Sequence, residues 1–266
     1  WQNPQENEFN LEKAMESAKL SFLEDIKAGY KILHIDPSID LYKKPDIDEV
    51  LQRVFELYEY CWSEAQKLNI DIAFEIGTEE QSASTNSLDE FEYSLNQITN
   101  FCKFNKLPLP IFVVAQTGTK VMEMKNIGSF ESPIRVENEV PAEIQLPKVL
   151  EICNKFEVYM KEHNADYLSN ESLNWHPKLG ITAANVAPEF GVTESKTFLK
   201  VLEENNLHSI ADQFIQIAYE SKKWKKWIMK NSIVDDRYKA IISGHYIFST
   251  NEFVELKKKA TQSPSK

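Results

Sequence analysis

Acidic residues follow a short apolar run near the start of this sequence. The run at 31–37 ends in a proline, and it places Asp36 and Ser38 at the C-terminal end of an expected strand. Alternation along a strand puts His34 and Asp36 on the same side, about 7 Å apart at about 3.3 Å per residue. A carboxylate in that place is suited to act as an acid, a base or an acceptor for sugar hydroxyls. The alternative is that Asp36 only caps the turn that follows.

A second carboxylate lies inside an apolar run. Glu75 interrupts the run at 70–77, and Glu79 follows that run. A buried carboxylate is costly unless it is paired, so Glu75 requires a partner in the fold. Glu75 and Glu79 are therefore candidates for proton transfer or metal coordination.

Polar residues also follow the later runs. His163 and Asp166 combine imidazole with carboxylate, a pair that suits a metal ion, although a single histidine at a helix-to-strand junction is more often structural. The small-residue turn at 117–119, which follows Gln116, offers backbone N–H groups to a phosphate oxygen. The candidate substrate-binding residues are Ser38, Gln116, Thr117, Gly118, Asp166 and Asn185.

These residues require strands that alternate with helices. Apolar spacing predicts helices over 9–28, 46–68, 87–104 and 142–160, and strands over 31–37, 70–77, 110–115, 163–168 and 179–185. Such alternation favours parallel strands, whose carboxyl ends gather polar side chains at one edge.

Composition excludes several classes of function. The chain has 266 residues, 42% of them hydrophobic, and a formal net charge of −11. That charge disfavours binding to nucleic acid or to anionic membranes. No run approaches the roughly 18 to 20 apolar residues of a membrane span. We expect a soluble, cytoplasmic protein whose three cysteines are buried thiols.

An ordered set of motifs resembles one known family, the accessory subunits of tagatose-bisphosphate aldolase. These Z-type, non-catalytic subunits were formerly named tagatose-6-phosphate kinases, and they are related to class II aldolases. The resemblance is carried by the tryptophan and glutamine at 1–2, LEKAM at 11–15, IDPS at 35–38, EIGTE at 75–79, QTG at 116–118 and HNADY at 163–167.

The resemblance implies an α/β fold of the (β/α)₈ TIM-barrel type. In that frame the five expected strands correspond to barrel strands four to eight, so the resemblance implies a partial (β/α) barrel over 1–205 and a C-terminal helical extension over 206–266, packed on the barrel. Three further strands would precede Trp1 in a longer parent protein or come from a partner. Five strands alone cannot close an eight-stranded barrel.

The resemblance also implies roles for residues. His163 corresponds to a zinc-binding histidine, and Glu75 or Glu79 to an acidic position. Gln116 stands where related aldolases have another histidine. We therefore expect Asp36 and Glu75 to be catalytic, and His163 and Glu79 to hold a divalent metal, most plausibly zinc.

Two functions follow from this resemblance. The first is sugar-phosphate metabolism as the accessory subunit of a class II tagatose-bisphosphate aldolase, a lyase, with a catalytic aldolase subunit as partner. The alternative is a metal-dependent epimerase of sugars or sugar phosphates that acts on its own. A sugar-phosphate ligand and an oligomer are expected in both cases.

Overall fold

The chain is an α/β protein with two compact units. The computed structural model describes residues 10–40, 45–77, 88–115, 117–128, 130–131 and 140–262. The first unit comprises Trp1–Gly118, Arg135–His163 and Leu173–Ala184, and the second comprises Thr119–Ile134, Asn164–Ser172 and Asn185–Lys266. Among the helices described, none combines the length and the apolar character that crossing a membrane requires.

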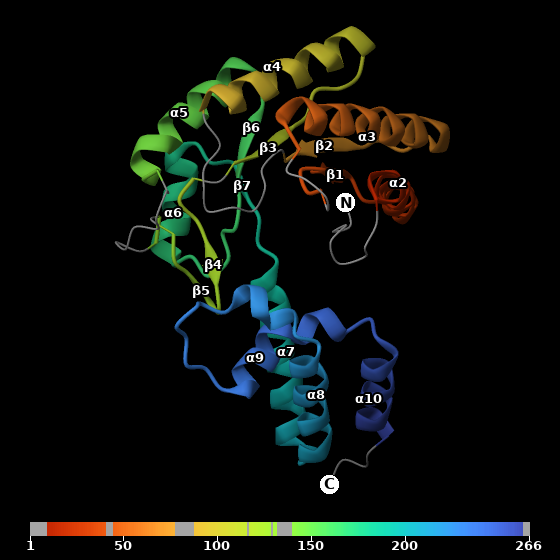
Figure 1. Cartoon of the computed structure of the whole chain (residues 1–266), viewed down its shortest axis with the longest axis vertical. Coiled ribbons are helices and arrows are strands. Elements are labelled where there is room, and N and C mark those ends of the chain that lie inside the picture. The colour runs from red at the N-terminus through yellow and green to blue at the C-terminus, as the bar shows by residue number, and fades with distance from the viewer. Residues whose placement is uncertain are drawn as a thin grey trace. The chain divides into compact units, whose positions relative to one another are not determined.

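A five-stranded parallel sheet organises the first unit (Figure 1). Its spatial order is β1-β2-β3-β6-β7, and every neighbouring pair is parallel. The predicted alternation of parallel strands with helices is therefore confirmed, whereas the eight-stranded barrel stays a prediction. The strands are β1 (Ile32–Ile35), β2 (Ala73–Ile76), β3 (Phe112–Ala115), β6 (Tyr159–Glu162) and β7 (Ala183–Ala184).

Helices cover one face of this sheet. Figure 1 shows α3, α4 and α5 as an outer layer over the strands. Asn10 caps α2 by accepting the N–H of Lys13, and Gly29 ends that helix at a φ of 87°. Asp46 and Glu49 form a reciprocal capping box at the start of α3. The helices are α2 (Leu11–Ala28), α3 (Ile47–Leu68), α4 (Leu88–Asn105), α5 (Ala142–Lys155) and α6 (Asn170–Leu179).

The register of the strands separates an apolar face from a polar one. Leu33 and Ile35 point into the core formed with α2 and α3, and the alternate residue His34 points to the opposite face. His34 pairs in register with Glu75 of β2, so both side chains lie on the same face. The face opposite α2 and α3 therefore carries the polar groups at the ends of the strands.

The fourth strand lies earlier in the sequence than its predicted position. The expected helix over 142–160 ends at Lys155, and β6 occupies Tyr159–Glu162 in place of the strand expected over 163–168. Glu157 has a φ of 59°, which turns the chain out of the helix. Apolar spacing did not predict this strand, because it contains the charged residues Lys161 and Glu162. The α6 helix was not predicted either.

The second unit is mostly helical. Its core joins Leu199 and Leu202 of α7 to Phe214 of α8 and Phe253 of α10. Thus α7 packs with the C-terminal helices. The domain boundary expected at residue 205 would instead place α7 in the same domain as the strands. The elements are the hairpin β4 (Val121–Met122) and β5 (Lys125–Asn126), helices α7 (Pro188–Glu204), α8 (His208–Glu220), α9 (Asp236–Ser243) and α10 (Asn251–Gln262), and the short helices η1 (Lys223–Trp227) and η2 (Gly244–Ile247).

The three cysteines are buried and free, as predicted. Burial raises the pKa of Cys61 to about 12, of Cys102 to about 11 and of Cys153 to about 12. A thiol disulfide reagent at pH 8 is therefore expected to modify none of them in the folded chain and all three in guanidinium chloride. Modification of one thiol under native conditions would contradict this burial.

Candidate functional site

Three polar side chains, those of His34, Glu75 and Lys161, meet on the polar face of the sheet in the first unit. The imidazole Nδ1 of His34 lies 2.7 Å from Oε1 of Glu75. The other oxygen of Glu75, Oε2, accepts a hydrogen bond of 2.6 Å from Nζ of Lys161 on β6. Both oxygens of this carboxylate, which is only 2% exposed, therefore have a cationic or imidazole partner. The partner that the sequence required for Glu75 is present.

These partners decide the charge of Glu75. Burial alone would raise the pKa of this carboxyl group, because a charged group loses hydration in the interior. The hydrogen bonds from His34 and Lys161 outweigh that effect, and the pKa lies below its usual value. Glu75 is therefore an ionised carboxylate at neutral pH.

Asp36 divides its two carboxylate oxygens between two partners. Oδ1 accepts the backbone N–H of Ser38 at 3.2 Å, which is the turn-capping role. Oδ2 lies 3.9 Å from Nε2 of His34. The two readings of Asp36 are thus compatible, since one oxygen shapes the turn while the other faces the imidazole.

Gly77 makes room for Asp36. Its backbone N–H donates to the carbonyl of Ile35, and a Cβ at Gly77 would lie 2.8 Å from Oδ2 of Asp36. We expect Gly77→Ala to displace the Asp36 carboxylate and to lower the free energy of unfolding by about 1–3 kcal/mol, the usual cost of overpacking. Urea denaturation measures this change. A variant as stable as the wild type, with unchanged chemical shifts for His34, would contradict this close packing.

His163 follows β6 at the same end of the sheet. Its backbone N–H donates to the carbonyl of Ala115. Burial lowers the pKa of its imidazole, and the negative charge of Asp36 opposes that effect. Asp36, Glu75 and His163, which the sequence assigned to one site, are therefore close enough to influence one another electrostatically.

The described residues do not fit a divalent cation. The structure describes no group of three or more histidine, cysteine, aspartate or glutamate side chains within 10–40, 45–77, 88–115, 117–128, 130–131 and 140–262 that could hold one. Glu75 uses both oxygens for His34 and Lys161, and the ammonium group of Lys161 would repel a second cation. Glu79 and Gln116 lie outside the described residues, so the expected zinc site stays a prediction.

A buried glutamate of β6 binds the start of the loop after β3. Oγ1 and the backbone N–H of Thr117 both donate to the carboxylate of Glu162, which is fully buried. Gly118 follows with a φ of 99°, which suits glycine. Thr117 is therefore fixed by a protein contact, whereas its predicted role in substrate binding stays a prediction.

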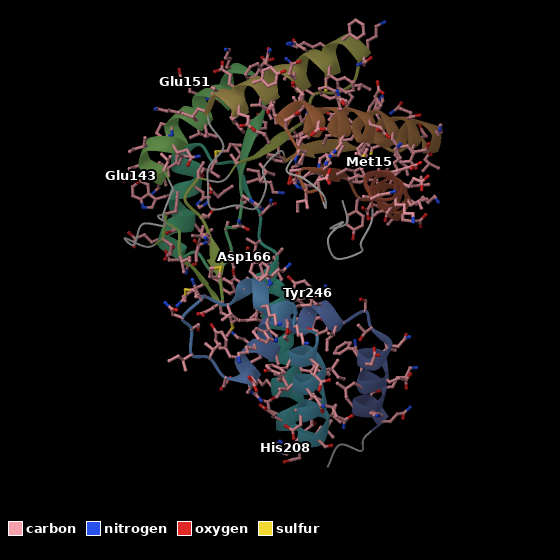
Figure 2. All side chains as sticks on the ribbon, in the orientation of Figure 1. Met15, Glu143, Glu151, Asp166, His208 and Tyr246 are labelled. Carbon is pink, nitrogen blue, oxygen red and sulfur yellow. The ribbon has the colours of Figure 1, made fainter. Side chains whose placement is uncertain are left out.

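Asp166 and Asn185 belong to the second unit. Oδ1 of Asp166 accepts the backbone N–H groups of Ala187 and Glu189, at 2.9 Å and 2.8 Å, and so caps the start of α7. The side chain is 1% exposed (labelled in Figure 2). The backbone carbonyl of Asn185 accepts the N–H of Ala165. Both contacts are structural, and the proposed binding roles stay predictions.

Lys161 and Glu162 are the site residues that sequence reasoning missed. Both lie on the strand that was predicted four residues too late. The alternation of side chains along 159–162 was the available signal, but charged residues in a strand broke the apolar pattern.

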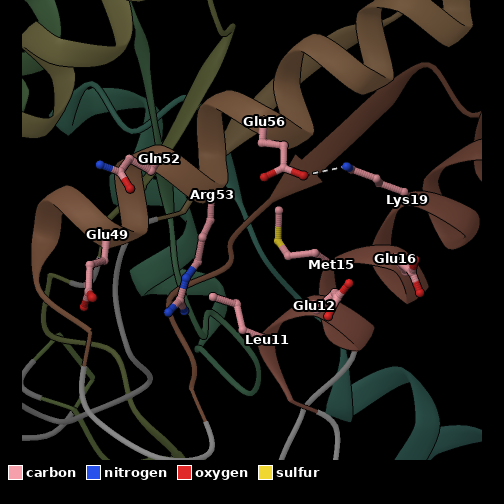
Figure 3. Close-up of a pocket in the computed structure, with 9 residues that line it drawn as sticks. All are labelled: Leu11, Glu12, Met15, Glu16, Lys19, Glu49, Gln52, Arg53 and Glu56. Atoms are coloured by element: carbon pink, nitrogen blue, oxygen red, sulfur yellow. Dashed lines mark hydrogen bonds and ion pairs between the residues drawn. The ribbon is translucent and has the colours of Figure 1, made fainter.

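A pocket of about 640 Å³ lies between α2 and α3 (Figure 3). Four glutamates line it, and an ion pair joins Lys19 to Glu56 across it. Arg53 lines the same pocket and also anchors the loop after β1, donating to the carbonyl of Pro37 and to Asp40. His34 and Glu75 are not among the residues that line this pocket, and Arg53 connects the pocket to the loop that follows Asp36.

Comparisons with known proteins identify the fold. No protein-family model matches the sequence, and no curated protein matches it. Several solved structures are similar, and two of them are informative. One is described as a probable tagatose 6 phosphate kinase from Sinorhizobium meliloti 1021 (TM-score 0.66, 15% identity, 95% of this chain and 65% of that one). The other is a glycerol complex of the fructuronate-tagaturonate epimerase UxaE from Cohnella laeviribosi. Its TM-score is 0.54 at 10% identity, and the match covers 90% of this chain and 58% of that one. The chain thus spans less than two thirds of either protein, and what it shares with both is the α/β fold.

Proposed function

We propose that this chain acts on a ketose or a ketose phosphate and that it moves a proton with His34. The observation that carries the proposal is the hydrogen bond between the imidazole Nδ1 and the buried carboxylate of Glu75. An ionised carboxylate can only accept, so Nδ1 carries a proton, and in the neutral imidazole the lone pair is then on Nε2. Glu75 thereby holds His34 in the form that a general base requires.

The environment of His34 suits this role. Its side chain is 44% exposed, so a ligand can reach Nε2, whereas Glu75 behind it is sheltered from water. A base in that place removes a proton from a hydroxyl group or from the carbon next to a carbonyl group. When the proton leaves the carbon, the C–H electron pair forms the C=C bond of an enolate, and the π pair of the C=O bond moves to the oxygen. When the proton leaves a hydroxyl group, the O–H pair forms a new C=O bond, the C–C bond breaks, and its pair forms the same kind of enolate. The ketone oxygen becomes an oxyanion in both cases. Both retro-aldol cleavage and epimerisation begin with such a step.

The substrate class is supported by the names of the two similar structures. One is described as acting on tagatose 6-phosphate and the other on fructuronate and tagaturonate, all of which are ketoses or derivatives of ketoses. A shared fold supports many chemistries, so the site residues carry the argument and the names only direct the choice of compounds.

The experiment incubates the purified chain in D₂O with ketoses, ketose phosphates and ketouronates, and follows deuterium incorporation and product formation by NMR. We expect exchange or turnover of at least one compound with the wild type, and a loss of about 10²-fold or more with His34→Gln. His208→Gln is the control, because His208 is exposed at the start of α8. No exchange by the wild type, or equal exchange by His34→Gln, would overturn the proposal.

A second proposal is the accessory role, in which the chain stabilises a catalytic class II aldolase subunit. Its support is the outer edge of the sheet: Tyr30 and Ile32 are 62% and 48% exposed, and β1 has a partner strand on one side only among the residues described. An exposed edge strand presents backbone N–H and C=O groups that can pair with another chain. Addition of the chain to a purified class II aldolase should then lengthen the half-life of that enzyme, and an unchanged half-life would refute this role.

A further inference from the structure

We propose that the ammonium group of Lys161 binds the substrate oxyanion, supplying the positive charge that a divalent cation supplies in metal-dependent sites. This inference rests on the proposed function, because it concerns the oxygen that becomes negative when His34 removes a proton. Lys161 was not among the residues that the sequence singled out.

The position of Lys161 follows from the register of the sheet. Glu75 pairs with Phe112, and Phe112 pairs with Tyr159, so Tyr159 lies on the same face as Glu75. Lys161 lies two residues beyond Tyr159 and therefore on that face too. Its side chain places Nζ 2.6 Å from Oε2 of Glu75. The ammonium group and the imidazole of His34 are thus held by the two oxygens of one carboxylate.

The contacts of Glu75 argue for an ammonium group in place of a metal ion. A metal ion bound to Glu75 would compete with His34 and Lys161, which already contact its two oxygens. A divalent ion beside the ammonium group would also meet strong repulsion in a partly dry site. Positive charge is nevertheless needed wherever an oxyanion forms, and Lys161 is the cation that contacts this carboxylate in the part of the chain that the structure describes.

Lys161 can reach a ligand. An ammonium group has three donors, and its contact with Glu75 uses one of them. The side chain is 20% exposed on the polar face of the sheet, so it is not fully enclosed by protein. The contact with Glu75 also fixes the long side chain before the ligand binds, which reduces the entropy lost on binding.

The test compares two probes that differ by one carboxylate. The carboxylate of 2-phosphoglycolate mimics the oxyanion, and methyl phosphate lacks it. Calorimetry of the chain in EDTA should show at least tenfold tighter binding of 2-phosphoglycolate. Lys161→Met should reduce this ratio to near one, whereas Lys161→Arg, which keeps the charge, should retain most of it. Lys155→Met is the control, because Lys155 is 62% exposed and pairs with Glu92 on the surface.

The outcomes separate this inference from the proposed function. A ratio unchanged in Lys161→Met, or one that vanishes in EDTA and returns with zinc, overturns the role of Lys161. The same holds if the wild type binds both probes equally, or neither of them. The deuterium-exchange experiment judges the proposed function independently, because loss of exchange in His34→Gln supports that function even when Lys161→Met leaves the binding ratio unchanged. Thermal unfolding of both Lys161 variants verifies that they fold.

Discussion

Glutamine in place of Glu75 is expected to lower the turnover of a ketose substrate by about 10³-fold while the chain stays folded. Lys161 only donates hydrogen bonds, so the amide oxygen must face Lys161 and the amide NH₂ group must face Nδ1 of His34. Nδ1 then has to accept, and the proton moves to Nε2. The imidazole keeps its place but loses the lone pair that a general base uses.

The measurement is kcat/KM of Glu75→Gln on the compound that gives the largest deuterium exchange with the wild type. Nitrogen chemical shifts of the His34 ring report which ring nitrogen carries the proton. Glu92→Gln is the control, because Glu92 forms an exposed ion pair with Lys155. Wild-type turnover in Glu75→Gln would remove the His34–Glu75 pair from the mechanism, and an unchanged tautomer with lost turnover would assign Glu75 another role.

The local signals of the sequence predicted much of the first unit. Asn10, Gly29 and Asp46 mark ends of helices by their capping chemistry, which depends only on neighbours in the chain. The runs around Leu33 and Phe74 are apolar because they are buried under helices. Placing Asp36 and Glu75 at neighbouring strand ends followed from these elements, since parallel strands end at the same edge.

The residues that prediction missed are those whose roles depend on distant partners. Lys161 is tolerated in a strand because Glu75, far away in the sequence, neutralises it. Glu162 is buried because Thr117 donates to it twice. Neither pairing leaves a local pattern, so the charged strand resembled the end of a helix. Asp166 was treated as a ligand residue, whereas its visible contacts are the N–H groups that begin α7.

Loss of the Arg53 guanidinium is expected to lower the free energy of unfolding by about 3–5 kcal/mol, the usual cost of removing one member of a buried ion pair. Arg53 and Asp40 have side chains only 6% and 9% exposed, and they are joined by a hydrogen bond of 2.6 Å. Arg53→Met keeps much of the apolar stem of the side chain, so the effect reports the charge. Urea denaturation of the wild type and the variant measures it.

A double variant distinguishes the effect of removing the whole ion pair from the effect of removing Arg53 alone. In Arg53→Met/Asp40→Leu neither charge remains, and much of the lost stability should return, because an apolar pair of similar volume often replaces a buried ion pair without cost. Lys67→Met, which removes an exposed ion pair with Glu64 on the same helix, should leave stability unchanged. Arg53 also donates to the carbonyl of Pro37, next to Asp36. The double variant should therefore stay less active than the wild type despite its restored stability, and equal activity would show that Arg53 does not position Asp36.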